Sequence, residues 1–273
     1  MHPDILFIVG RDSAFNDNLP LRIALRSLEK HAAGYGRVIV AGEVPSWLSS
    51  RAVHISFRQD PETGKAWNIM HNIANAVASA GIKRPFLLSS DDHYFCRDFR
   101  NLADWPHFSH PDRILSPEEI AAAGKKYSEF KKCLYETRLL LERHNLPTRR
   151  YSMYLNSWLD PEDLAAAVSI AESIPQNDRP FIGYEITCLA GNIHTARTKN
   201  IGENHAVYNH DKRITSKFSL FEKIANRSVY QFSTTPKAER SREVMTALLS
   251  LFPAKSSFEA IPLEPNALEL YTA

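Results

Sequence analysis

Short apolar runs alternate with amphipathic stretches along the first hundred residues. Apolar spacing predicts one helix through Leu21, Leu25 and Leu28 and a second helix from Lys65 to Ala80. Apolar-rich runs before, between and after them predict strands at 5–9, 38–41, 53–57 and 86–89. Strands that alternate with helices imply right-handed crossovers and a largely parallel sheet.

After about residue 110 this alternation lapses. The pattern predicts helices from the Ser116 capping box to about Asn145, from Asp160 to before Pro175, and from about Lys237 to Leu251. Strands are predicted at 151–158 and 181–189. The expected fold class is α/β: a Rossmann-type, mostly parallel sheet flanked by helices in 1–110, and a mixed helical and strand half in 111–273, within one continuous domain.

The strand at 86–89 ends in Asp91, Asp92 and His93. Two adjacent carboxylates repel each other, so a cation or a hydrogen-bond network must offset their charge. Oxygen ligands of this kind suit Mg²⁺ or Mn²⁺. The alternative is a strand-to-turn junction whose aspartates only cap backbone N–H groups. Arg11 and Asp12 follow the first strand and are expected at the same ligand-binding edge of the sheet.

Composition fits a globular protein, with 44% hydrophobic residues and a formal net charge of +2 that implies no partner by itself. Cys96, Cys133 and Cys188 lack metal-ligand spacing, which suits free thiols in a reducing compartment. Neither a signal peptide nor an apolar stretch of membrane-spanning length is found, so we expect a cytoplasmic protein. No Gly-rich phosphate loop is found, which argues against dinucleotide dehydrogenases and P-loop NTPases.

The run from Asp60 through Phe95 resembles GT-A glycosyltransferases that use nucleotide-sugar donors. Residues 21–30 and 249–259 look like the corresponding segments of bacterial and phage-encoded members. The resemblance implies a UDP-sugar donor whose diphosphate is bridged by Mn²⁺ or Mg²⁺ at an acidic motif. Ser90 stands where the first aspartate of that motif is usual. The site is then either Ser-Asp-Asp with Asp92 as main ligand, or Asp-Asp-His with His93 contributing.

The resemblance also implies roles for residues around this motif. Lys65 and Asn68, on the helix before the acidic strand, would hold the nucleotide; otherwise they are solvated first-turn residues. Asp91 would assist them. A late histidine, His205 or His210, would complete the metal shell, unless both are plain surface residues. Arg11 and Asp12 would contact the base and ribose of the donor, or simply pair with each other.

An inverting sugar transfer needs a carboxylate to deprotonate the acceptor hydroxyl. Glu185, expected inside the strand at 181–189, is the first candidate and Asp160 the second. The alternative for Glu185 is an exposed strand residue. The two halves of the chain would then bind the nucleotide sugar (1–110) and the acceptor (111–273).

Basic residues with interleaved aromatics mark the segment 197–242. Such a surface suits phosphate backbones and stacked bases, although a solvated helix face over core aromatics has the same pattern. The expected function is a metal-dependent glycosyltransferase whose acceptor is a hydroxylated base in phage DNA. The alternatives are transfer of a sugar or sugar phosphate to a surface polysaccharide, and a catalytically silent nucleic-acid-binding domain on the same fold.

Overall fold

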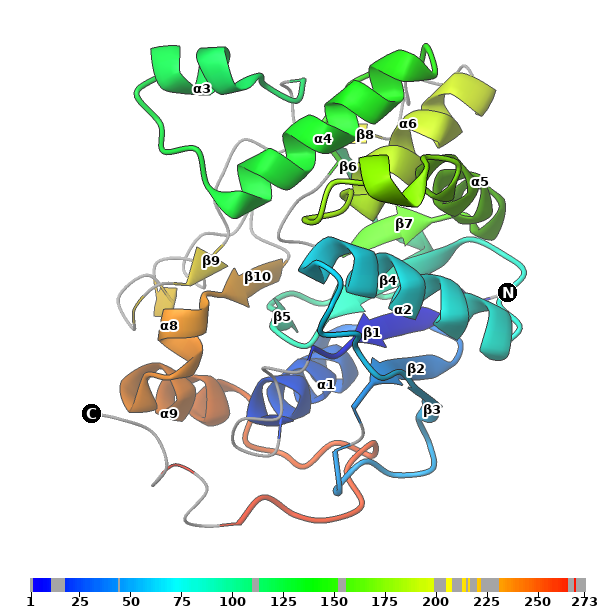
Figure 1. Cartoon of the computed structure of the whole chain (residues 1–273). Coiled ribbons are helices and arrows are strands. Elements are labelled where there is room, and N and C mark those ends of the chain that lie inside the picture. Colours follow the sequence, from blue (N-terminus) through cyan, green and yellow to red (C-terminus); the bar gives the residue numbers. More distant parts are fainter. Residues whose placement is uncertain are drawn as a thin grey trace.

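A five-stranded sheet forms the centre of the protein in the computed structural model (Figure 1). The structure describes residues 2–10, 18–43, 45–109, 113–151, 156–198, 205–207, 213–214, 216, 220–221, 231–264 and 268. The strands lie in the order β3-β2-β1-β4-β7. Their bounds are β1 Ile5–Ile8, β2 Val38–Gly42, β3 Val53–Ser56, β4 Phe86–Ser90 and β7 Ser157–Leu159. All neighbours are parallel except β4 and β7, which confirms the predicted mostly parallel sheet.

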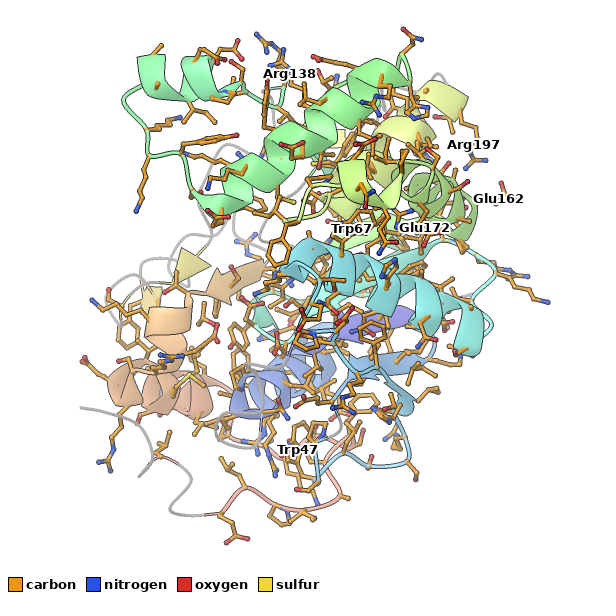
Figure 2. All side chains as sticks on the ribbon, in the orientation of Figure 1. Trp47, Trp67, Arg138, Glu162, Glu172 and Arg197 are labelled. Atoms are coloured by element: carbon orange, nitrogen blue, oxygen red, sulfur yellow. The ribbon has the colours of Figure 1, made fainter. Side chains whose placement is uncertain are left out.

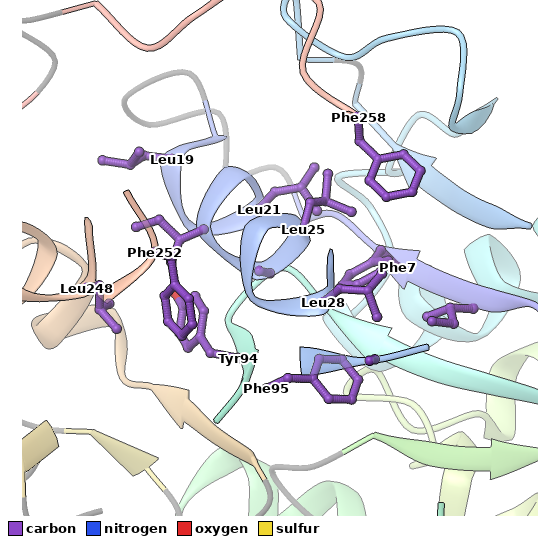
Figure 3. Packing of buried hydrophobic residues seen from close by; sticks show 14 of the residues in the cluster. Phe7, Leu19, Leu21, Leu25, Leu28, Tyr94, Phe95, Leu248, Phe252 and Phe258 are labelled. Atoms are coloured by element: carbon purple, nitrogen blue, oxygen red, sulfur yellow. The ribbon is translucent and has the colours of Figure 1, made fainter. Parts of the chain in front are cut away.

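Helices cover both faces of this sheet. Successive residues of β1 serve two separate cores: Ile5 and Phe7 belong to one cluster and Leu6 to the other. The first cluster contains α1 (Leu19–His31) and α9 (Arg242–Leu251), and Figure 3 shows its members around α1. The second contains α2 (Lys65–Ser79), α4 (Glu129–Arg143), α5 (Pro161–Glu172) and α6 (Ile186–Thr198). A strand buried on both faces explains the continuous apolar runs of the first half.

Smaller elements extend the carboxyl edge of the sheet. β5 (His93–Phe95) pairs with β10 (Gln231–Thr234), which pairs with β9 (Arg213–Ile214). α8 (Pro236–Glu239) follows β10 directly, and Figure 1 shows β10 beside β5 and α8 next to α9. β6 (His107–Ser109) pairs with β8 (His205–Val207). The remaining short helices are η2 (Leu102–Asp104), α3 (Pro117–Ala122) and η3 (Gln176–Asp178).

Of the strand predicted at 151–158, the described residues contain only β7 (Ser157–Leu159), because 152–155 lie outside the described residues. Three further predictions for the second half are wrong in part. The helix expected from Ser116 to Asn145 is two helices, because Gly124 has φ +62° and ends α3, although the Ser116 capping box is present. The strand expected at 181–189 is instead a turn and loop over 181–185 followed by the first residues of α6, whose buried residues follow helical spacing. The helix expected from Lys237 is interrupted between α8 and α9, where the Ser241 side chain caps α9.

The C-terminal segment returns to α1. The Glu259 carboxylate, 3% exposed, accepts hydrogen bonds from Arg22 (2.9 Å) and from Arg26 (2.8 and 2.9 Å). The Arg22 guanidinium also lies over the ring of Trp47, 4.4 Å from its centroid. This buried ion cluster fixes the tail against the helix that precedes β2. None of the helices in the described ranges has the length and hydropathy of a bilayer span.

Candidate functional site

Asp91 and Asp92 lie at the carboxyl edge of the parallel strands, in the turn between β4 and β5. The end of β1 is adjacent, since Ile8 pairs with Ser90. The Ser90 hydroxyl donates to Asp91 Oδ1 at 3.0 Å, and the Asp92 side chain is 23% exposed. The pair therefore occupies the place where open α/β sheets bind ligands, as the sequence predicts.

A third carboxylate, Glu239, approaches this pair from α8. The Thr234 hydroxyl donates to Glu239 Oε1 at 2.9 Å, and the Thr234 N–H donates to the carbonyl oxygen of Asp92 at 3.3 Å. Partial burial, followed by the negative charges of Asp92 and Asp91, raises the pKa of the Glu239 carboxyl to about 7. The positive charge of Lys65 opposes this rise. Sequence reasoning missed Glu239, because it read residues 237–251 as one amphipathic helix.

Lys65 and Asn68 occupy the first turn of α2, but they have different surroundings. Lys65 is exposed. Asn68 is buried, and its amide accepts from Asp60 N–H (2.7 Å) and donates to Asp60 O (2.9 Å) and to Thr63 Oγ1 (3.0 Å). Asn68 therefore shapes the loop that precedes α2, whereas Lys65 is presented at the carboxyl edge. The role of either residue toward a nucleotide stays a prediction.

His93 is the third residue of the predicted motif that the structure places at this edge. Its ring is 8% exposed, and its Nε2 lies 3.8 Å from Asp92 Oδ1. Its Nδ1 is hydrogen-bonded to Asn156 Oδ1 at 3.2 Å. The carboxyl edge thus holds Asp91, Asp92 and His93 together, with Glu239 and Lys65 close enough to affect its electrostatics.

Glu185 precedes α6 and caps it. Its Oε2 accepts hydrogen bonds from the Cys188 N–H and the Thr187 hydroxyl, each at 2.7 Å. Its own N–H donates to Thr137 Oγ1 at 2.8 Å. Gly183, two residues earlier, packs against the backbone of Trp67 in the first turn of α2. The role of Glu185 as a base stays a prediction, but one carboxylate oxygen is committed to the helix.

Asp160 lies at the opposite edge of the sheet. Leu159 pairs with Phe86 at the start of β4, whereas Asp91 follows the end of β4, roughly 15 Å further along the strand direction. The structure therefore separates Asp160 from the Asp91–Asp92 pair. This separation argues against Asp160 as the general base for a reaction at the Asp91–Asp92 turn.

Asp160 belongs instead to a second polar cluster. Its ligand atom lies within 4.8 Å of those of Asp163 and His194, and among the described residues no other set of three meets this spacing. Arg197 donates to Asp163 (2.9 and 3.0 Å) and to Asp160 (3.3 Å). Figure 2 shows Arg197 on the same side of the molecule as Glu162, which it also contacts at 3.4 Å. A guanidinium therefore already supplies the positive charge of this cluster, which borders a cavity of about 210 Å³.

Several predicted site residues have no described side chain. Arg11, Asp12 and His210 lie outside the described residues. His205 belongs to β8, where its backbone pairs with His107 of β6. The predictions for these four residues stay open.

The described site thus consists of one acidic turn, one histidine, one lysine and a carboxylate from a distant helix. No protein-family model and no curated protein matches this chain.

Proposed function

We propose that this protein is a metal-assisted glycosyltransferase of GT-A type, which transfers a sugar from a nucleotide-diphosphate donor to an acceptor hydroxyl. One observation carries the proposal: Asp91, Asp92 and Glu239 crowd together at the carboxyl edge of the sheet, and the pKa of Glu239 is raised to about 7. An excess of negative charge at a ligand-binding edge is what a divalent cation offsets.

The donor set fits Mg²⁺ or Mn²⁺. Both ions prefer oxygen ligands, and magnesium is commonly held by one or two carboxylates together with substrate phosphates. Asp92 and Asp91 would hold the ion, which when bound offsets the charge that grows on the departing nucleoside diphosphate. The exposed ammonium of Lys65, at the first position of α2, would contact the diphosphate. The N-terminus of that helix also favours negative charge.

Glu239 suits the role of proton acceptor. Burial is the largest cause of its raised pKa, and this contribution remains when a cation offsets the charges of Asp92 and Asp91. A raised pKa gives the carboxylate the basicity that proton transfer from a hydroxyl requires. The hydrogen bond from Thr234 fixes one of its oxygens. In Glu185, by contrast, one carboxylate oxygen accepts two hydrogen bonds at the N-terminus of α6 and is committed to capping that helix. We therefore assign the base to Glu239.

The acceptor is proposed from the charge beside Glu239. Three exposed basic residues flank it in sequence: Lys237 on α8, Arg240 directly after α8, and Arg242 at the start of α9. This cationic rim beside the proposed general base, Glu239, suits a polyanionic acceptor. DNA that carries a hydroxylated nucleobase is polyanionic and also supplies the acceptor hydroxyl. Retention on duplex DNA that weakens steeply with salt would support this acceptor. Retention on an anionic polysaccharide alone would favour surface-glycan transfer.

Thermal unfolding with a panel of nucleotide sugars tests the function directly. UDP-sugars should raise the melting temperature in the presence of Mn²⁺, because they bind the folded state. Mn²⁺-dependent hydrolysis of the effective donor should follow, and Asp92→Asn should abolish both effects. Asp178→Asn, at an exposed aspartate in η3, is the matched control and should change neither. If no nucleotide sugar shifts the transition with any divalent ion, the proposal is wrong.

A further inference from the structure

Three buried polar side chains form a hydrogen-bonded chain next to the Asp91–Asp92 turn. Gln231 is fully buried, Asn156 is 1% exposed and His93 is 8% exposed. Gln231 Nε2 lies 2.8 Å from Asn156 Oδ1, and His93 Nδ1 lies 3.2 Å from that same oxygen. They come from three strands or strand ends that are far apart in sequence, so the contact is built by the fold.

The direction of each hydrogen bond in this chain follows from the backbone. The Asn156 N–H donates to Gln231 Oε1 at 2.8 Å, which identifies that atom as the oxygen of the amide. Gln231 therefore directs its NH₂ group at Asn156, whose Oδ1 must accept. An oxygen that faces His93 Nδ1 requires a proton on that nitrogen. The neutral imidazole is thus held as the Nδ1–H tautomer.

This tautomer leaves a lone pair on His93 Nε2, the atom that lies 3.8 Å from Asp92 Oδ1. Metal bonds to histidine nitrogen and carboxylate oxygen are about 2.0–2.2 Å long, so one ion can contact both atoms. Two buried polar atoms nearby, Asn156 Nδ2 and Ser233 Oγ, have no hydrogen-bond partner within the described part of the chain. Ser233 lies directly opposite His93 in the β5–β10 pair, on the same face. These groups suit an oxygen of a bound ligand.

We infer that Gln231 and Asn156 are positioning residues, which hold His93 so that its Nε2 and the Asp92 carboxylate bind the same divalent cation. This inference rests on the cation site of the proposed function. It makes the site a mixed nitrogen and oxygen site rather than an all-oxygen site. Although both ions prefer oxygen, the transition-metal ion Mn²⁺ accepts an imidazole nitrogen more readily than Mg²⁺ does, so the site should select Mn²⁺ over Mg²⁺.

The tautomer is measured in the unmodified protein. In ¹⁵N-histidine-labelled protein without metal, the long-range ¹⁵N–¹H pattern of His93 should show a protonated Nδ1 and an unprotonated Nε2. Assignment comes from the one signal set that His93→Gln removes. A protonated Nε2 in the neutral ring would overturn the inference, whether or not any variant folds.

Two isosteric variants then test the positioning role through Mn²⁺ binding, measured by electron paramagnetic resonance at pH 8. Gln231→Glu replaces the donating NH₂ group with an acceptor. The Asn156 amide must then turn, so that its NH₂ group faces both the new carboxylate and His93 Nδ1. The imidazole then protonates Nε2, and Mn²⁺ affinity should fall about 10- to 100-fold. Asn156→Asp adds the same charge but keeps an acceptor facing Nδ1, so it should bind Mn²⁺ at least as tightly as the wild type.

The outcomes separate this inference from the proposed function. Equal Mn²⁺ affinity of Gln231→Glu and the wild type would overturn the inference and leave a carboxylate-only site. Equal losses in both variants would also overturn it, because the tautomer would then be irrelevant. The predicted pattern without turnover of any nucleotide sugar would support the metal site and refute the glycosyltransferase. Absence of Mn²⁺ binding by the wild type would refute both.

Discussion

Asp92 and Glu239 are joined through a single residue, Thr234. The backbone N–H of Thr234 donates to the Asp92 carbonyl oxygen, and its hydroxyl donates to the Glu239 carboxylate. Because that hydroxyl gives its proton to Glu239, the Tyr94 hydroxyl, 3.3 Å from Thr234 Oγ1, must donate to it. Two carboxylates that are far apart in sequence are therefore held in one hydrogen-bond network. Burial and the nearby aspartate charges raise the pKa of Glu239 within it, and this shift can be measured.

The raised pKa of Glu239 predicts a stability difference that depends on pH. The folded state favours the protonated carboxyl, so stability is lost as the pH rises from the ordinary value of 4.5 through about 7. The full shift corresponds to at most about 3 kcal/mol, reduced by solvent screening at this partly exposed group. In EDTA, Glu239→Gln should match the wild type near pH 4.5 and exceed it in unfolding free energy at pH 8. Urea denaturation across this range measures the difference, and a gap independent of pH would contradict the prediction.

The buried ion cluster of Glu259 predicts a large loss of stability for a neutral substitution. Glu259→Gln removes the charge that two buried guanidinium groups share, and breaking a buried pair costs about 3–5 kcal/mol. Glu62→Gln, at an exposed residue, is the matched control and should stay within about 0.5 kcal/mol. Urea denaturation of the wild type and both variants measures the difference in unfolding free energy. A loss below about 1 kcal/mol would mean that the tail is not fixed by this cluster.

Periodicity predicted the first half of the chain well, for a physical reason. Strands β1, β2 and β4 are buried on both faces, so their apolar runs are continuous, and the amphipathic helices α1 and α2 separate these runs in the sequence. In the second half, short apolar runs fit a strand and a helix equally. At 181–189 the left-handed conformation of Gly183 (φ +82°) and the Glu185 cap favour a turn followed by a helix. Apolar periodicity contains neither signal.

The site was predictable only where its residues are adjacent in sequence. Asp91, Asp92 and His93 lie together at the end of a predicted strand, and the carboxyl-edge rule placed them correctly. Glu239 and Gln231 reach this edge through β10, which pairs antiparallel with β5 across more than 130 residues. No local pattern encodes such a pairing. Their contribution therefore required the structure.

Gly64 and Gly81, at the two ends of α2, should respond differently to substitution by alanine, in both stability and donor binding. A Cβ at Gly64 would meet the backbone of Phe181, with its carbonyl carbon at 2.8 Å, so Gly64→Ala must displace the segment packed on the first turn. We expect a loss of about 1–3 kcal/mol and weaker donor binding, because Lys65 moves. Gly81, beyond the other end, has φ +61° and open space, so Gly81→Ala should cost about 1–2 kcal/mol without affecting the donor. Equal donor affinities in both variants would mean that Lys65 does not contact the donor.

The choice between two candidate bases predicts opposite results for two matched substitutions. Glu239→Gln removes the carboxylate proposed to accept the hydroxyl proton, and loss of such a base lowers the rate about 10²- to 10⁴-fold. Glu185→Gln keeps an amide oxygen that can accept from the Cys188 N–H, so the cap of α6 survives and turnover should stay within a few-fold of the wild type. Sugar transfer is measured under saturating donor and Mn²⁺, with metal binding checked in each variant, because an intact cation site excludes indirect loss. If Glu185→Gln abolishes transfer while Glu239→Gln retains it, the base is Glu185, and the raised pKa of Glu239 reflects only its burial and the charges of the neighbouring aspartates.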